Sequence, residues 1–320
     1  MRLEKVSSPA TRLERFVASL SQAVASEFGT YLVTVPIKAP SRLPRISQLH
    51  TQPHWISFPV ALANHQQRDI KAPAIRSTLI HDILSAQYFM YLSVRLKDDL
   101  LDGQAAGRTL SEVSHSLERT AVEILRRWFE PSSKFWGFFE RYVKDTTEGI
   151  DEVERLQRRV RRDPEEMLDG FARTSSIFKI GTAALCVASG KVNVMRTLES
   201  ILDHLAIGGQ IVDDIRDMVE DLECGRYNHA VQMLLKGNGQ AVSRLEASQH
   251  LLSALLNPRS LEEVVSVAVY HFKAAHVLLK RLRLHELYGI PVVQQRAAEN
   301  LIEQIHHRRM RVLFGRNESS

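Results

Sequence analysis

Apolar residues recur every three to four positions along most of this chain, which is the spacing of an amphipathic helix. From Ala74 onward the pattern is nearly continuous, and glycines and prolines that end helices interrupt it. It predicts helices over residues 74–100, 110–128, 133–160, 164–190, 194–222, 240–255, 260–287 and 292–312. The apolar stripes are wide and follow no strict heptad, so we expect the helices to pack around a common centre as one large bundle.

The first 60 residues have a different pattern. Apolar residues at helical spacing come first, and they are Leu13, Phe16, Leu20 and Val24. They predict one helix over residues 9–27, and five prolines from Pro36 to Pro59 then predict an irregular crossing segment. We expect a single domain over residues 1–320, in which residues 1–60 precede a helical core over residues 61–315.

Composition narrows the class of protein. The chain has 320 residues, of which 44% are apolar and 25% are charged, so it can bury a large core and is not a disordered chain. Only 15 glycines and 11 prolines, with few alternating runs, exclude an all-β sandwich or barrel. The predicted fold class is all-α.

Cysteine usage and the ends of the chain indicate the compartment. Cys186 and Cys224 are too few for a disulfide framework or a thiolate metal cluster, which favours a reducing environment. No secretory signal and no apolar run of about 18 residues is found, so we expect a cytoplasmic protein without integral membrane association.

The charge balance is basic, with a formal net charge of +5 and a pI of about 9.2. The densest basic runs, residues 155–162 and 306–311, are typical of solvated helix faces, and we expect no nucleic-acid partner. A basic balance also suits a small anionic substrate such as a diphosphate.

An acidic motif, DDLLD, ends the helix predicted over residues 74–100. Asp98 and Asp102 are four residues apart, so both carboxylates project from one face of that helix, and Asp99 follows Asp98 directly. Like charges at this spacing repel, and the helix dipole disfavours anions at a C-terminal end. A divalent cation between the carboxylates relieves both costs, and hard oxygen ligands favour Mg²⁺ or Mn²⁺.

A second acidic motif, GGQIVDDIRD, lies near the end of the helix predicted over residues 194–222. Asp213 and Asp217 repeat the four-residue spacing. Solvated acidic helix ends are the plain alternative, but two copies with the same spacing disfavour it. Gly208 and Gly209 indicate close helix packing, because no strand followed by a GxGxxG loop is present.

Two acidic helix ends that face each other in an apolar bundle can hold several magnesium ions around a diphosphate, with the hydrocarbon part of the ligand in the core. Metal ions of this kind stabilise the charge that develops on a departing diphosphate. Departure leaves a carbocation, which survives only where water is excluded.

The pair of motifs resembles the two aspartate-rich motifs of the trans-isoprenyl diphosphate synthase family. The similarity covers residues 75–226, and residues 221–227 resemble the DLxxGKxT stretch of that family. The resemblance implies the class I isoprenoid synthase fold, a central apolar cavity, three Mg²⁺ ions that Mn²⁺ can replace, a prenyl diphosphate substrate and a homodimer.

The resemblance also implies site residues. The metal-binding set is Asp98, Asp99, Asp102, Asp213, Asp214 and Asp217. In this set Asp98 and Asp102 bind two of the ions and Asp213 binds the third. Gln210 faces the isoprenoid chain near the reacting carbon, and Arg226 is a candidate to cover the diphosphate, with plain surface solvation as the alternative.

Departures from the family bear on the reaction. Chain-elongating members carry a GGKR-type segment for isopentenyl diphosphate ahead of the first motif, and residues 51–57 contain no such cluster. Of an Arg-Arg pair after that motif only Arg108 is kept. The Lys-Thr pair of the family is matched by Gly181 and Thr182, with Lys179 as a substitute cation.

The chain length of the substrate is read from two small residues, Ser93 and Val94, which stand where bulky residues close the pocket floor in the family. They favour a C20 or longer diphosphate, and C15 stays open.

We therefore expect a magnesium-dependent terpene synthase that ionises an allylic prenyl diphosphate and cyclises the cation. A chain-elongating prenyltransferase and a catalytically silent partner subunit are the alternatives.

Overall fold

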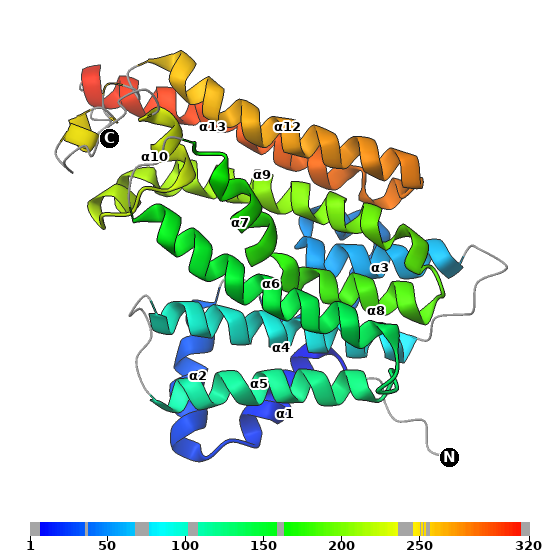
Figure 1. The fold of residues 1–320 in the computed structure, drawn as a ribbon. Helices are drawn as coiled ribbons and strands as arrows, with labels where there is room; N and C mark the ends of the chain where they lie inside the picture. Colours follow the sequence, from blue (N-terminus) through cyan, green and yellow to red (C-terminus); the bar gives the residue numbers. More distant parts are fainter. Residues whose placement is uncertain are drawn as a thin grey trace, which may run out of the picture. The chain divides into compact units, whose positions relative to one another are not determined.

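The computed structural model describes residues 7–35, 38–67, 77–101, 108–158, 163–235, 246–249, 251, 253 and 257–314. These residues form helices joined by short connections, and none of them lies in a strand (Figure 1). The predicted all-α class is confirmed. The chain divides into two compact units: unit 1 comprises Met1–Val143 and Ile177–Arg196, and unit 2 comprises Lys144–Ser176 and Thr197–Ser320.

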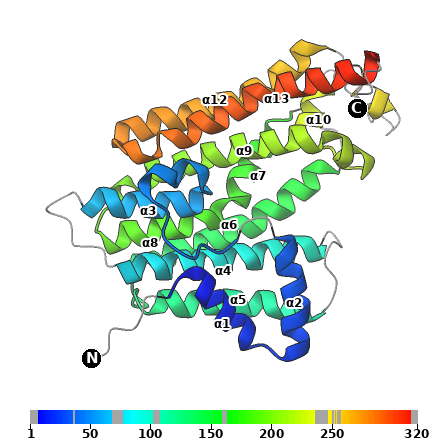
Figure 2. The same ribbon diagram turned by 180° about the vertical axis from the view of Figure 1, so that it is seen from behind.

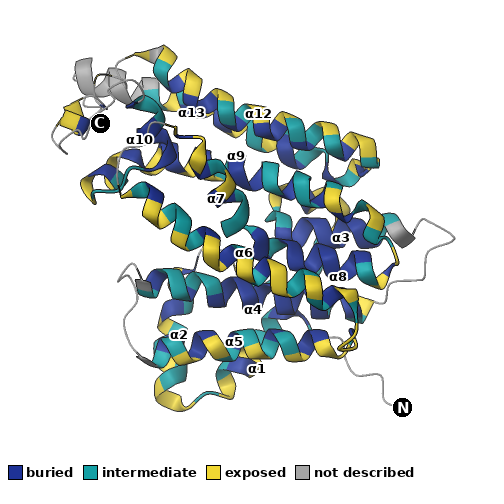
Figure 3. Cartoon of the chain, viewed as in Figure 1, coloured by how far each residue is buried: buried dark blue, intermediate teal, exposed yellow. Residues whose placement is uncertain are grey.

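Unit 1 is organised around α4 (Ser77–Leu101). α4 runs beside α5 (Arg108–Arg126) in both ribbon views (Figure 1, Figure 2), and it also contacts α1, α3 and α8. The other helical segments of this unit are α1 (Pro9–Ala18), α2 (Gln22–Thr34), η1 (Ile46–Thr51), α3 (His54–Gln67), the first part of α6 (Lys134–Gln157), α8 (Ile180–Ala188) and η3 (Val192–Val194). Most residues of α3, α4 and α8 are buried (Figure 3), so these helices form the core of the unit.

The N-terminal region differs from the single helix predicted over residues 9–27. The structure has two helices, because α1 ends at Ala18 and α2 begins at Gln22. The Oγ of Ser19 donates to the carbonyl of Phe16 at 2.6 Å, a local bond that competes with continuation of the helix.

The predicted crossing segment contains α3, which the sequence pattern missed. Residues 55–63 are all buried, so this helix is apolar on every side and shows no amphipathic period. Pro53 precedes its first turn, and Pro59 lies inside it. Proline spacing therefore predicted an irregular connection where burial in fact stabilises a helix.

The helix predicted over residues 164–190 is also divided. It consists of α7 (Glu166–Thr174), the 3₁₀ turn η2 (Ser176–Lys179) and α8. The break is fixed by the buried side chain of Gln87 on α4. Its Nε2 donates to the carbonyl of Ile177 at 2.8 Å, and its Oε1 accepts from the amide of Gly181 at 2.8 Å.

Unit 2 contains α7, α9, α10, α12 and α13, together with the second part of α6. The bounds not yet given are α9 (Met195–Glu223), α10 (His229–Leu234), α12 (Pro258–Leu282), η4 (His285–Leu287) and α13 (Gly289–Phe314). α12 and α13 pack against each other as a hairpin. The helix predicted over residues 240–255 falls mostly outside the described residues.

α9 ends in a glycine-dependent turn. Gly225 has a φ of +77°, and the amide of Arg226 donates to the carbonyl of Asp221 at 2.7 Å. The amide of Gly225 donates to the carbonyl of Leu222 at 3.0 Å, so the helix ends in a Schellman motif. No helix in the described part of the chain is long and apolar enough to cross a membrane.

Gly208 and Gly209 provide a matched test of how closely α9 approaches α12. A Cβ atom at Gly208 would lie 2.6 Å from a ring carbon of buried Phe272, whereas one at Gly209 would have no neighbour within 4 Å. We expect Gly208→Ala to lower the free energy of unfolding by about 1–3 kcal/mol through overpacking. Gly209→Ala should raise it by up to about 1 kcal/mol, because alanine is the better helix former. Urea unfolding followed by circular dichroism measures both, and equal effects would contradict the close approach.

His204 and His271 form a second contact between α9 and α12, with their Nδ1 atoms 2.9 Å apart. Burial, and then the neighbouring His204, lowers the pKa of His271 to about 4. The unfolded chain therefore binds more protons between about pH 6.5 and pH 4, so stability falls as the pH is lowered through this range. We expect the free energy of unfolding to drop more between pH 7 and pH 5 in the native chain than in His271→Phe. Parallel pH profiles from urea titrations would show that this histidine does not contribute.

Candidate functional site

The first acidic motif occupies the last turn of α4. The side chain of Asp98 is 43% exposed, and the guanidinium of Arg95, one turn earlier, lies 3.8 Å from its carboxylate. Asp102 lies outside the described residues. The structure therefore presents Asp98 as an accessible carboxylate at the C-terminal end of a buried helix.

Asp99 has a different environment from its neighbour. Its side chain is 9% exposed and accepts a hydrogen bond from the Tyr31 hydroxyl at 2.8 Å. The guanidinium of Arg95 lies 2.8 Å from the same carboxylate. Burial and the adjacent Asp99 raise the pKa of Tyr31, so its hydroxyl stays protonated and donates. Asp99 thus joins α4 to α2 within unit 1.

The aspartates of the second acidic motif lie in the last three turns of α9. Gln210, Asp213 and Asp217 are exposed, and the Asp213 carboxylate is 2.9 Å from the guanidinium of Arg216. Desolvation, followed by the charges of Asp221 and Glu220, raises the pKa of Asp217. These crowded carboxylates favour binding of a cation.

Asp214 is buried, and both of its oxygens accept hydrogen bonds from the protein. The amide of Gln210 donates to one oxygen and the backbone amide of His229 donates to the other, each at 2.9 Å. Burial outweighs these bonds and raises the pKa of Asp214 to about 7. Asp214 therefore joins the end of α9 to the first turn of α10.

Asn228 connects the same two helices. Its Oδ1 accepts from the amide of Val231 at 3.0 Å and so caps α10, while its Nδ2 donates to the carbonyl of Asp214 and to the carboxylate of Asp221. Arg226 forms an ion pair with Asp221 at 2.9 Å. In this structure Arg226 stabilises the end of α9. Sequence reasoning missed Asn228, although an asparagine ahead of a short apolar run is a helix N-cap signal.

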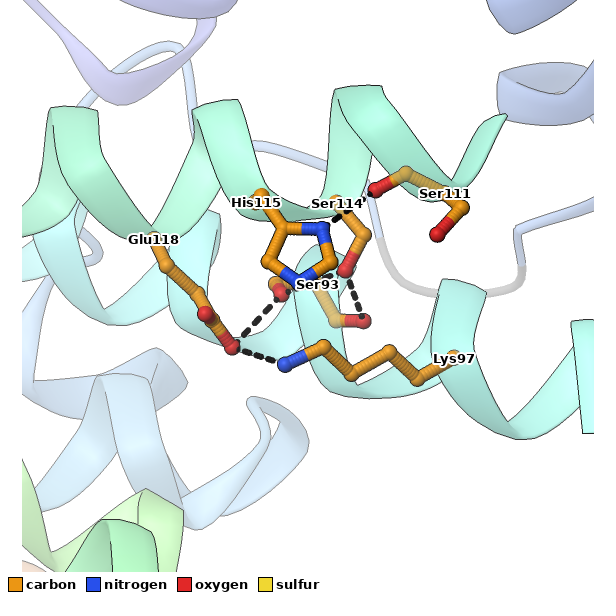
Figure 4. Close-up of polar contacts among 6 residues, drawn as sticks. All are labelled: Ser93, Lys97, Ser111, Ser114, His115 and Glu118. Carbon is orange, nitrogen blue, oxygen red and sulfur yellow. Dashed lines mark hydrogen bonds and ion pairs between the residues drawn. The ribbon is translucent and has the colours of Figure 1, made fainter. Parts of the chain in front are cut away.

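Ser93 faces α5. It is buried, and its hydroxyl is 2.9 Å from the Ser114 hydroxyl and 3.1 Å from a carboxylate oxygen of Glu118 (Figure 4). Lys97 forms an ion pair with the same oxygen of Glu118. These contacts hold the last two turns of α4 against α5. Val94, the other predicted floor residue, is half-buried.

Lys179 lies at the junction of η2 and α8. It is buried, and its Nζ is 5.9 Å from the centre of the Tyr142 ring. Thr182 is fully buried, and its Oγ1 has no hydrogen-bond partner among the described residues. Arg108 begins α5, but its side chain lies outside what the structure describes, as does Gly107.

Four aromatic rings form a group between α3, α4 and η2. Trp55 stacks on Tyr91 with ring centres 5.9 Å apart, and Tyr91 is 6.1 Å from Phe178. Tyr88 completes the group at 5.9 Å from Trp55. Their π faces are chemically suited to an apolar or cationic guest.

The carboxylates of the two motifs are hard oxygen donors of the kind that Mg²⁺ prefers. Asp98, Asp213 and Asp217 are accessible, and desolvation and like charges raise the pKa of Asp217, so these residues fit a divalent cation. In the described part of the chain no three histidine, cysteine, aspartate or glutamate side chains converge as a complete metal site.

Comparison with known proteins identifies the fold. No protein-family model matches the sequence, and no curated protein matches it. Heptaprenyl diphosphate synthase from Staphylococcus aureus superposes with a TM-score of 0.68 at 13% identity, covering 90% of this chain and 96% of that chain. A polyprenyl synthetase from Streptomyces coelicolor A3(2) gives 0.66 at 15% identity, covering 89% and 96%. Geranylgeranyl pyrophosphate synthetase from the archaeon Geoglobus acetivorans gives 0.61 at 14% identity, covering 89% and 99%.

At these identities the likeness establishes the fold. The chain has the all-helical class I isoprenoid synthase fold that the two acidic motifs predicted. The similar structures are described as prenyl or polyprenyl diphosphate synthases.

The two neighbouring aspartates of the second motif should differ in their effect on stability. Asp214→Ala leaves the buried amide of His229 without an acceptor, so we expect a loss of about 1–3 kcal/mol in the free energy of unfolding. Asp213→Ala removes only an exposed ion pair and should change stability by less than about 0.5 kcal/mol. Urea unfolding of both variants makes the comparison. A larger loss of stability in Asp213→Ala than in Asp214→Ala would contradict the assignment of Asp214 as the buried anchor.

Proposed function

We propose that this chain is a magnesium-dependent enzyme that ionises an allylic prenyl diphosphate and joins the resulting cation to isopentenyl diphosphate. The observation that carries the proposal is the fold, shared over about nine-tenths of the chain with proteins described as prenyl diphosphate synthases. Two DDxxD motifs at the ends of long helices support it.

The residues of the chain have distinct roles in this proposal. Asp98, Asp102 and Asp213 hold magnesium, and Asp217 supports Asp213. When bound, magnesium supplies Lewis-acid stabilisation of the charge on the departing diphosphate. Asp99 and Asp214 are committed to internal hydrogen bonds, so they orient the helix ends that carry the ligands.

Buried groups of unit 1 serve the organic part of the substrate. The rings of Trp55, Tyr88 and Tyr91 exclude water and present π faces to a cation. Lys179, which Gln87 fixes through the turn that precedes α8, is a candidate cation for the diphosphate. Small Val94 beside the motif fits a chain of C15 or longer.

Cyclisation of the allylic cation is the second candidate function. The specific observation in its favour is the absence of the basic segment that holds isopentenyl diphosphate. Residues 51–57, which run from the end of η1 into the start of α3, contain no lysine or arginine. Arg42 and Arg45 are exposed nearby. An allylic cation that meets no isopentenyl diphosphate attacks its own double bonds. The same ionisation step can therefore lead either to elongation or to cyclisation.

The test is incubation of the purified chain and Mg²⁺ with C10, C15, C20 and C25 allylic diphosphates, each with and without isopentenyl diphosphate. We expect a longer linear diphosphate only when isopentenyl diphosphate is present, and no product after chelation of the metal. Asp98→Asn and Asp213→Asn should each lower turnover at least about a hundredfold, because the metal contributes several kcal/mol to transition-state stabilisation. Asp151→Asn, an exposed carboxylate on α6 outside both motifs, is the matched control and should retain full activity.

Each outcome identifies a different function. A cyclic hydrocarbon or alcohol formed without isopentenyl diphosphate would replace elongation by cyclisation. Undiminished turnover in a folded Asp98→Asn or Asp213→Asn variant would exclude the metal assignment. No product from any substrate, with circular dichroism showing native helicity, would favour a catalytically silent subunit.

A further inference from the structure

The outer face of α12 combines exposed apolar side chains with exposed cations. Tyr270 is 64% exposed and Val277 is 49% exposed. Lys273, Lys280 and Arg281 are exposed on the same helix. At about 100° per residue, these five positions fall within one sector of about 100° around the helix axis, so they form a single surface. We refer to these five residues as the α12 face.

The formally charged side chains around the α12 face, over residues 264–285, are all positive. Residues 264–285 contain no aspartate or glutamate, although the chain has 37 acidic residues. Within the part of the chain that the structure describes, Lys273, Lys280 and Arg281 form no side-chain hydrogen bond or ion pair. Other cations of the same unit are paired, as Arg173 is with Glu148. The α12 face therefore exposes positive charge that the described protein does not neutralise.

Arg283 adds a fourth exposed cation, and its backbone is unusual. It ends α12 with a φ of +56°, and it is the only residue other than glycine with a positive φ in the described part of the chain. Glycine is the favoured residue at such a helix end, because a side chain is strained in this conformation. The backbone alone does not explain an arginine here. Its exposed side chain adds to the positive charge at this end of α12.

We infer that the α12 face is a docking surface for an anionic lipid bilayer. Unpaired lysines and arginines are attracted to the negative headgroups of such a surface. Tyr270 and Val277, between these cations, supply the aromatic and aliphatic groups that enter the interfacial region of a bilayer. An anionic polymer such as a nucleic acid would use the cations but gain nothing from an exposed valine, and this difference favours the bilayer.

The inference goes beyond the proposed reaction and is tested without any substrate. The full chain is sedimented with vesicles of 70% phosphatidylcholine and 30% phosphatidylserine, and with vesicles of phosphatidylcholine alone, at 0.1 M and 0.5 M salt. We expect binding to the anionic vesicles only, weakened by salt because screening shortens the range of the attraction.

Charge reversal tests the cations. The triple variant Lys273→Glu, Lys280→Glu, Arg281→Glu should bind anionic vesicles at least about tenfold more weakly, since each basic residue near a membrane contributes severalfold to affinity. The matched control is Arg126→Glu, Arg127→Glu, Lys134→Glu, three exposed cations of unit 1 with the same change in net charge. It should weaken binding by less than about threefold, and native helicity is checked in both variants.

Two further variants distinguish insertion of apolar groups from electrostatic attraction, and a role of Arg283 in binding from a role in stability. Tyr270→Ser with Val277→Ser keeps every charge, so any loss of binding that persists at 0.5 M salt reports insertion of the apolar groups. Arg283→Gly should raise the urea midpoint, because glycine relieves the strained backbone, and at the same time weaken vesicle binding. A purely structural arginine would not give opposite effects on stability and binding.

Three results would overturn the inference. Equal binding to phosphatidylcholine alone would show that headgroup charge is irrelevant. Unchanged binding of the triple variant would place the docking surface elsewhere on the chain. Binding to heparin that the triple variant loses, with no vesicle binding by the native chain, would reassign the face to an acidic polymer.

Discussion

A carboxylate buried at the end of an apolar helix must find hydrogen-bond donors inside the protein, and this requirement fixes both acidic helix ends of the chain. Asp99 meets it through Tyr31 and Arg95, and Asp214 meets it through Gln210 and the amide of His229. Successive residues on a helix point about 100° apart. Once the second aspartate of each pair is anchored inward, the first aspartate is directed outward, which keeps its carboxylate accessible for a cation.

The anchors also join each motif to a neighbouring element. Asp99 connects α4 to α2, and Asp214 connects α9 to α10, where Asn228 adds a cap and two further bonds. Loss of an anchor should therefore affect the packing of two elements, whereas loss of an accessible carboxylate should leave that packing unchanged. The difference follows from burial: desolvation raises the pKa of Asp214 to about 7, and the hydrogen bonds from Gln210 and His229 offset only part of that effect.

Amphipathic patterning predicted α5, α6, α9 and α12 well because one face of each meets solvent. α4, α5, α6, α9 and α12 begin and end within a few residues of the predicted bounds. The sequence pattern missed α3 because residues 55–63 are buried on every side, which removes the 3.6-residue period of apolar positions. The pattern missed the division between η2 and α8 for another reason. This division depends on contacts with Gln87, about 90 residues earlier in the chain, and local sequence does not encode them.

The candidate site stays a prediction that rests on repetition. The repeated DDxxD spacing singled out Asp98 and Asp213, but it could not tell an accessible carboxylate from its buried neighbour, because that depends on Tyr31 and on the turn into α10. Ser93 illustrates the same limit: as a small residue it is consistent with a deep pocket, yet its hydroxyl bonds to α5 and stabilises helix packing. The two kinds of feature are therefore encoded differently. The acidic helix ends are visible as a repeat in the sequence, whereas the turn that carries Lys179 depends on a contact with Gln87 that lies far away in the chain.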